Sequence, residues 1–231
     1  MTSDQAPETK TKTRDEIAAA YISEPWWYDV RGFFILTFAY NSTIWGQLAF
    51  FSRNFGARHL EVACGTGTLL ELVLKWRALQ RRPQPQIVGV DYAESMLAGA
   101  MHRFRKSPNI SLMHADAAAM PFEDASFDTV NVANAVHCFP DVRGAFAGCF
   151  KVLRPGGTMA ANVLLYPRGW FPFRQIAQAI NEWGVRKGIL VTPYRHDEVV
   201  ALIRGAGFEI VEDSVSGNCA NILARRPLGG A

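Results

Sequence analysis

The chain has 231 residues, of which 49% are hydrophobic, 12% aromatic and 19% charged, and its formal net charge is +3. This length suits one α/β domain with an added lid, and the hydrophobic share can fill a sizeable core. The small charge and the absence of a dense Lys/Arg stripe argue against a nucleic-acid-binding protein. The four cysteines lack Cys-x-x-Cys spacing and the N-terminus does not resemble a signal peptide, so we expect no metal site and a cytoplasmic protein with reduced thiols.

The N-terminal quarter of the sequence differs in composition from the rest. Residues 1–13 are polar and are predicted to form a disordered tail, and residues 14–55 are predicted to form a helical cap. Residues 32–52 carry no charge and are long enough for a membrane span, but polar residues such as Gln47 interrupt them. Helical spacing of the apolar residues favours two short helices. A helix in transient contact with a membrane surface is the second interpretation, and a true span is the third.

After residue 55 the sequence alternates between strand and helix patterns. Predicted strands lie at 59–63, 86–91, 110–114, 127–133 and 158–165, the last one preceded by a turn at 154–157. Predicted helices lie at 68–79, 93–104, from 141 onward, at 174–183 and at 196–205, and a hairpin of 208–214 and 219–225 ends the chain. This order predicts a Rossmann-like, seven-stranded, mainly parallel sheet with an antiparallel last strand and helices on both faces.

A strand, a glycine turn and a helix follow one another between His59 and Leu70. Glycines in the turn allow a ligand to approach the backbone closely, and the start of the helix supplies free N–H groups, as in nucleotide-binding sites. Asp91 ends the second strand, where a carboxylate can accept both hydroxyls of a ribose. An alternative role for Asp91 is to cap the following helix, but its coincidence with the turn favours the ribose.

The residues of the turn exclude two classes of nucleotide. Leu70 stands in place of the third glycine of a dinucleotide fingerprint, and the Gly-Lys-Ser/Thr of a phosphate loop is absent. Glu61, near the end of the first strand, repels a pyrophosphate and suits a cationic group. S-adenosylmethionine has a sulfonium, an ammonium and no phosphate, so it fits this turn.

Five short motifs in order resemble those of class I S-adenosylmethionine-dependent methyltransferases. The motifs are Glu61–Gly67, Asp91, Asp116-Ala117, Phe127–Val130 and Leu153–Thr158. The resemblance covers about residues 55–225 and is greatest to the branch that includes the ubiquinone and menaquinone C-methyltransferases. It implies a methyltransferase domain over residues 56–231, with a cap insertion at about 166–194. Two departures are small: Ala63 replaces the first glycine of the commoner motif, and Glu61 replaces an aspartate.

The resemblance also implies which residues contact the cofactor. The turn would lie against its methionine part, Glu61 would assist its ammonium, Asp91 would bind its ribose, and Asp116 would accept its adenine amino group. The full set that the resemblance implies is Glu61, Ala63, Cys64, Gly65, Thr66, Gly67, Asp91, Tyr92, Met96, Asp116, Ala117 and Asn134.

Methyl transfer needs an aligned acceptor and a dry site, and it needs a base only where the acceptor must lose a proton. His137 follows the fourth strand and is the candidate base, although packing against the rim is an alternative role. The four other histidines are interpreted as structural.

The acceptor pocket is predicted to come from two aromatic segments with few acids, 26–55 and 166–194. Its candidate lining residues are Tyr28, Tyr40, Tyr166 and Trp170. Aromatic walls favour a flat or hydrophobic acceptor, although these side chains could instead simply pack the lid. The sequence therefore predicts methyl transfer to a small, aromatic or hydrophobic molecule by a monomer or homodimer. Two alternatives stay open: a cyclisation or rearrangement that uses the bound cofactor, and a non-catalytic subunit that binds it.

Overall fold

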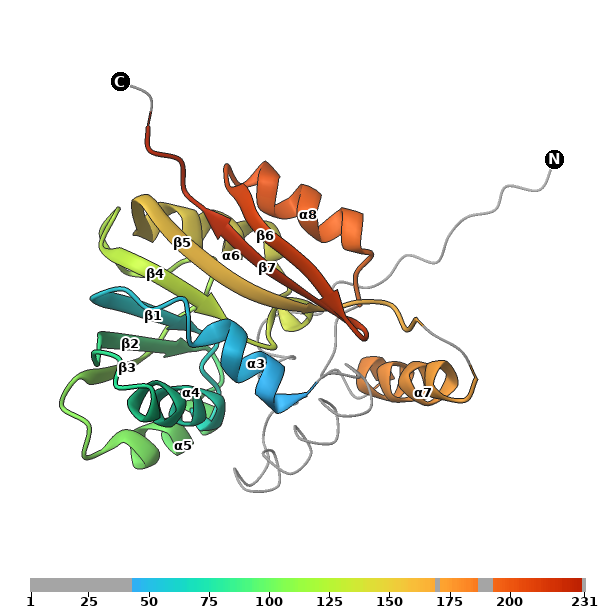
Figure 1. Cartoon of the computed structure of the whole chain (residues 1–231), viewed down its shortest axis with the longest axis horizontal. Helices are drawn as coiled ribbons and strands as arrows, with labels where there is room; N and C mark the ends of the chain where they lie inside the picture. Colours follow the sequence, from blue (N-terminus) through green and yellow to red (C-terminus); the bar gives the residue numbers. More distant parts are fainter. Residues whose placement is uncertain (1–42, 169–170, 187–192, 230–231) are drawn as a thin grey trace.

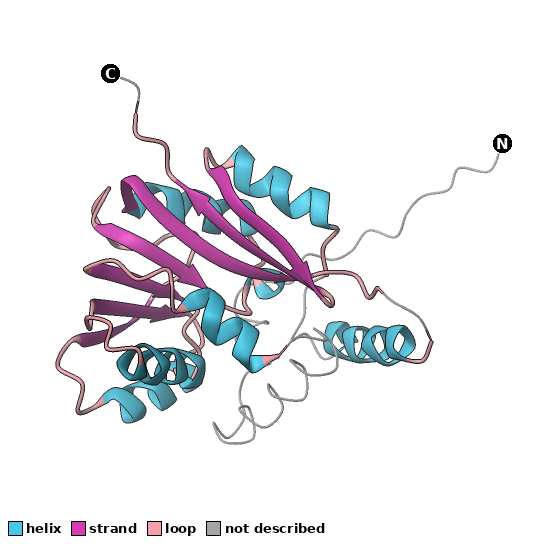
Figure 2. Ribbon diagram, in the orientation of Figure 1, coloured by secondary structure: helices cyan, strands magenta, loops and turns pink. Residues whose placement is uncertain are grey.

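The computed structural model describes residues 43–168, 171–186 and 193–229, and in these ranges seven strands form one sheet between helices (Figures 1 and 2). The strand order is β3-β2-β1-β4-β5-β7-β6. Strands β1 to β5 are parallel, and β7 runs antiparallel to both β5 and β6. The predicted Rossmann-like, mainly parallel sheet with its antiparallel last strand is thereby confirmed.

The predicted elements agree with the observed ones to within a few residues, apart from the start of β5. The strands are β1 Arg58–Val62, β2 Gln86–Asp91, β3 Ile110–His114, β4 Phe127–Val132, β5 Leu153–Leu164, β6 Glu209–Ser216 and β7 Cys219–Arg225. The described helices are α3 Ile44–Phe51, α4 Thr68–Leu79, α5 Glu94–Phe104, the short 3₁₀ helix η1 Val136–Cys138, α6 Val142–Val152, α7 Phe173–Arg186 and α8 His196–Gly205.

Each face of the sheet has its own hydrophobic cluster. On one face, Leu60 of β1 and Val130 of β4 pack with residues of α6 and α8, such as Phe146 and Ile203. On the other, α3 and α4 share a cluster with Ala160 of β5. Strands covered on both sides read as nearly continuous apolar runs, which explains why β2 and β4 were recognisable in the sequence.

The predicted turn at 154–157 is wrong, because these residues continue strand β5. The pairing of β4 with β5 jumps from Phe127–Leu153 to Thr129–Thr158, so residues 154–157 form a bulge. The Gly156 N–H donates to the Arg226 carbonyl oxygen at 2.8 Å, and the Arg226 N–H donates to the Gly157 oxygen at 2.9 Å. The chain after β7 thus supplies strand-like hydrogen bonds to a Pro-Gly-Gly segment that is typical of a turn.

Most of the predicted N-terminal cap, including Tyr28 and Tyr40, lies outside the described residues. Its described end, α3, begins at a helix cap in which the Thr43 hydroxyl accepts the Gly46 N–H at 3.1 Å. Helix α3 packs on the sheet beside α4 (Figure 1). None of the described helices is long and apolar enough to cross a membrane.

Candidate functional site

The glycine turn after β1 is held open by alternating left-handed residues. The φ angles of Ala63, Gly65 and Gly67 are 54°, 58° and 76°. A left-handed conformation costs an L-residue such as Ala63 roughly 1–2 kcal/mol, which explains why the commoner motif has a glycine there. A Cβ atom added at Gly65 would meet no atom within 4 Å. The backbone at Gly65 is therefore accessible to a ligand.

Asp91 directly contacts the turn. One of its carboxylate oxygens accepts the Gly65 N–H at 2.7 Å, and the other accepts the Ala93 N–H at 2.8 Å. Burial raises the pKa of the Asp91 carboxyl, while the hydrogen bonds from Ala93 and Gly65 oppose that rise. The structure thus holds a buried carboxylate beside an open backbone segment, which suits a neutral polyol such as a ribose.

The end of β3 supplies the next part of the site. Asp116 accepts the Ala118 N–H at 2.9 Å, and the rings of Tyr92 and His114 lie 5.1 Å apart. Helix α6 approaches this loop closely, because a Cβ added at Gly148 would lie 2.5 Å from the Ala117 carbonyl oxygen. This packing places the predicted adenine-side residues on a rigid support.

Asn134, after β4, has hydrogen-bond partners within the protein for both its side-chain oxygen and its side-chain nitrogen. Its side chain exchanges hydrogen bonds with that of Gln47 from α3, at 3.0 and 3.2 Å. Asn162 of β5 donates to the Asn134 side-chain oxygen at 2.7 Å and accepts the Asn134 N–H at 2.6 Å. These three residues, which we call the amide cluster, hold Asn134 at a φ of 55°. A cofactor contact from Asn134 would therefore use its backbone carbonyl oxygen or the second hydrogen of its side-chain amide.

The remaining predicted cofactor residues are less accessible. Thr66 and Met96 are buried, and Glu61 is only 5% exposed on the face of β1 that carries His59. Burial, together with the nearby Asp91 and Glu61, raises the pKa of the Cys64 thiol well above its usual value. Cys64 is therefore a thiol, and a nucleophilic thiolate at this position is disfavoured.

His137, the candidate base, lies on η1 and is 6% exposed. Burial lowers its pKa to about 4, so the imidazole is neutral at pH 7. A neutral imidazole can accept a proton, but at this pKa it is a weaker base than an exposed histidine.

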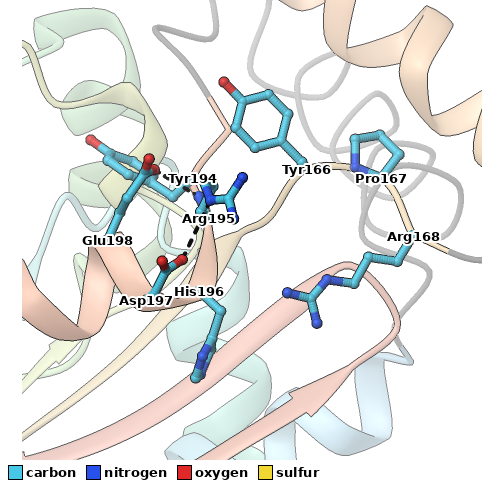
Figure 3. A pocket seen from close by; sticks show the side chains of 8 residues that line it. All are labelled: Tyr166, Pro167, Arg168, Tyr194, Arg195, His196, Asp197 and Glu198. Atoms are coloured by element: carbon cyan, nitrogen blue, oxygen red, sulfur yellow. Dashed lines mark hydrogen bonds and ion pairs between the residues drawn. The ribbon is translucent and has the colours of Figure 1, made fainter.

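A cavity of about 530 Å³ opens beyond the carboxyl end of β5 (Figure 3). Tyr166, predicted as an acceptor residue, lines it, whereas Trp170 lies outside the described residues. The other lining residues are Pro167, Arg168, Tyr194, Arg195, His196, Asp197 and Glu198. Tyr194, the last residue of the predicted aromatic segment 166–194 but not one of its four candidate residues, reaches the site through a parallel bridge with Leu165.

Two polar side chains of this cavity already have acidic partners. Arg195 lies 3.6 Å from Asp197, and the His196 ring lies 2.8 Å from Asp213. Burial raises the pKa of Tyr194 to about 12, so its hydroxyl stays protonated. The cavity therefore offers two aromatic rings with polar groups at their edges, a combination that suits a small organic ligand.

The fold and the glycine turn are similar to those of class I S-adenosylmethionine-dependent methyltransferases, one of which has been solved in complex with S-adenosylmethionine. Residues 60–161 match the family model described as a methyltransferase domain. Over 102 residues the chain is 34% identical to the demethylmenaquinone methyltransferase of Staphylococcus aureus strain JH9. This match covers 44% of the chain and 41% of the relative, so the chain aligns with less than half of that enzyme.

Solved structures share the same fold at low identity. A methyltransferase in complex with the Haloferax volcanii Trm112 activator has a TM-score of 0.66 at 20% identity, over 94% of this chain and 100% of that one. The cyclase SpnF has a TM-score of 0.63 at 19% identity, over 80% of this chain and 81% of that one. Phosphoethanolamine N-methyltransferase 2 of Haemonchus contortus, in complex with S-adenosylmethionine, has a TM-score of 0.62 at 18% identity, over 79% of this chain and 53% of that one.

Proposed function

We propose that this protein transfers a methyl group from S-adenosylmethionine to a small, aromatic or hydrophobic acceptor. The observation that carries the proposal is the contact between the Gly65 N–H and the buried Asp91 carboxylate at the carboxyl edge of the sheet. The cofactor supplies a methyl group that its sulfonium has already activated. The protein's part is to hold the ribose at Asp91, to align the acceptor and to exclude water.

The acceptor site that we propose is the cavity beyond β5. Tyr166 and Tyr194 come from chain segments that pair with each other, since the Tyr166 N–H donates to the Tyr194 carbonyl oxygen at 3.0 Å. Strand β5 is parallel to β1, so the cavity and the glycine turn lie at the same edge of the sheet. Two phenol rings there favour a flat acceptor.

The test is to incubate the purified chain with S-adenosylmethionine and a panel of hydroxylated naphthalenes, quinols and fatty acids. We expect S-adenosylhomocysteine to form together with a 14 Da increase in the mass of one acceptor, about one CH₂ group. The cyclase among the fold neighbours shows that this fold can serve another reaction. An acceptor that reacts without a mass increase and without S-adenosylhomocysteine would replace this proposal with a rearrangement.

For an acceptor that must lose a proton, we propose His137 as the base. Because its pKa is lowered to about 4, activity should rise with pH around pH 4 and be flat near neutrality. A histidine with an unshifted pKa would place the rise in activity at about pH 6.5. We expect His137→Phe to lower kcat by at least about tenfold. A folded variant with unchanged kcat would make His137 a packing residue, and a pH–rate profile with an inflection near 6.5 would point to another base.

A further inference from the structure

His59 and Glu61 lie two residues apart on β1, so their side chains share one face of the sheet. His59 is completely buried, and its Nε2 atom lies 3.2 Å from a carboxylate oxygen of Glu61. Its Nδ1 atom lies 2.8 Å from the hydroxyl of Thr129 on the adjacent strand β4. Both ring nitrogens of His59 therefore have polar partners.

The partners assign the position of the proton on His59. A carboxylate can only accept a hydrogen bond, so Nε2 carries the hydrogen that is donated to Glu61. The Thr129 oxygen accepts the Gly56 N–H at 2.9 Å, which leaves its own hydrogen for the unprotonated Nδ1. A directed series of hydrogen bonds thus runs from Gly56 through Thr129 and His59 to Glu61.

The surroundings favour this neutral form of His59. Its ring stacks on the Phe55 ring, with the two ring centroids 3.8 Å apart. The Arg77 guanidinium in turn lies 4.6 Å from the centroid of the Phe55 ring. Burial lowers the pKa of His59, and the charge of Arg77 lowers it further, against the opposing effect of Glu61. A neutral donor orients the Glu61 carboxylate without cancelling its negative charge.

We propose that His59 is a positioning residue that orients the Glu61 carboxylate toward the ammonium group of the cofactor. The inference rests on the proposed use of S-adenosylmethionine. His59 binds one oxygen of Glu61, and the other oxygen accepts no hydrogen bond from the described part of the chain. That second oxygen is the one that a cationic ligand group can reach, because the Glu61 side chain retains slight exposure. A fixed, charged acceptor binds an ammonium more tightly than a mobile one.

The test compares two ligands that differ in the aminocarboxypropyl part. S-adenosylhomocysteine has the ammonium group, and 5′-methylthioadenosine lacks it, so only the first should depend on Glu61. We expect His59→Phe to weaken S-adenosylhomocysteine binding by about tenfold and to leave 5′-methylthioadenosine binding within about twofold. In a Glu61→Gln background, His59→Phe should cause no further loss, because the two residues act through one interaction.

Two further variants cover the case in which His59→Phe does not fold. Thr129→Val removes the hydroxyl that fixes the His59 ring and should weaken S-adenosylhomocysteine binding but not 5′-methylthioadenosine binding. His59→Gln keeps an N–H donor and should bind S-adenosylhomocysteine more tightly than His59→Phe does. Equal losses for both ligands, or additive losses in the double variant, would overturn the inference. Failure of the proposed function has a different signature: the wild-type chain binds S-adenosylhomocysteine, but no acceptor gains mass.

Discussion

Replacing Asp91 with Asn is expected to weaken S-adenosylmethionine binding by about a hundredfold, or roughly 3 kcal/mol. The buried carboxylate accepts the Gly65 and Ala93 N–H groups and has lone pairs left for two ribose hydroxyls. The amide of an asparagine has only one acceptor oxygen. Its NH₂ group would face an N–H of Gly65 or Ala93, or a ribose hydroxyl, all of which need an acceptor. Isothermal titration calorimetry with S-adenosylmethionine measures the effect directly.

The matched control is Asp124→Asn, which neutralises an exposed acid whose only described ion pair is with Lys151. This control should bind the cofactor with wild-type affinity. Thermal unfolding without the cofactor tests whether the Asp91 variant is folded. If the folded variant binds S-adenosylmethionine as tightly as the wild type does, Asp91 is not the ribose-binding acid.

The second large effect is expected at Gly67, where alanine should destabilise the protein by about 3 kcal/mol. Two costs combine there: a left-handed φ of 76° and a Cβ that would lie 2.5 Å from the Phe104 ring. The control is Gly65→Ala, which has a similar φ of 58° but open space around the new Cβ. Its cost in stability should be about 1 kcal/mol, from the backbone alone.

Urea unfolding of the two alanine variants separates packing from backbone strain. The difference in the free energy of unfolding between them measures the cost of placing a Cβ atom at position 67 against the Phe104 ring of α5. Equal losses would mean that the Phe104 ring moves aside freely and that the turn is not braced by α5.

The glycine turn and Asp91 were predictable because each is a local pattern at a strand end. The roles of other residues depend on partners that are distant in sequence. Asn134 was expected among the cofactor contacts, and the hydrogen bonds between its side chain and Gln47, which lies 87 positions earlier in the chain, could not be foreseen from the sequence. The pairing of Tyr194 with β5 likewise depends on the path of the chain between them.

His59 is an intermediate case. It was interpreted as structural because it lies at the start of a strand. The alternation of side chains along β1 could have shown that it shares a face with Glu61. Its second partner, Thr129, comes from β4, and that contact follows only from the register between the strands. Sequence reasoning could thus suggest the pair but could not assign the proton.

The amide cluster has a consequence for how the N-terminal region and the ligand site influence each other. Gln47 comes from α3, while Asn134 and Asn162 follow or belong to the central strands. Any free energy that seats α3 on the sheet therefore also stabilises the left-handed backbone at Asn134. By thermodynamic reciprocity, a ligand that requires this backbone geometry must hold α3 in place by the same amount. If the cofactor contacts Asn134 as the resemblance implies, sequence changes in α3, remote from the glycine turn, would change its affinity.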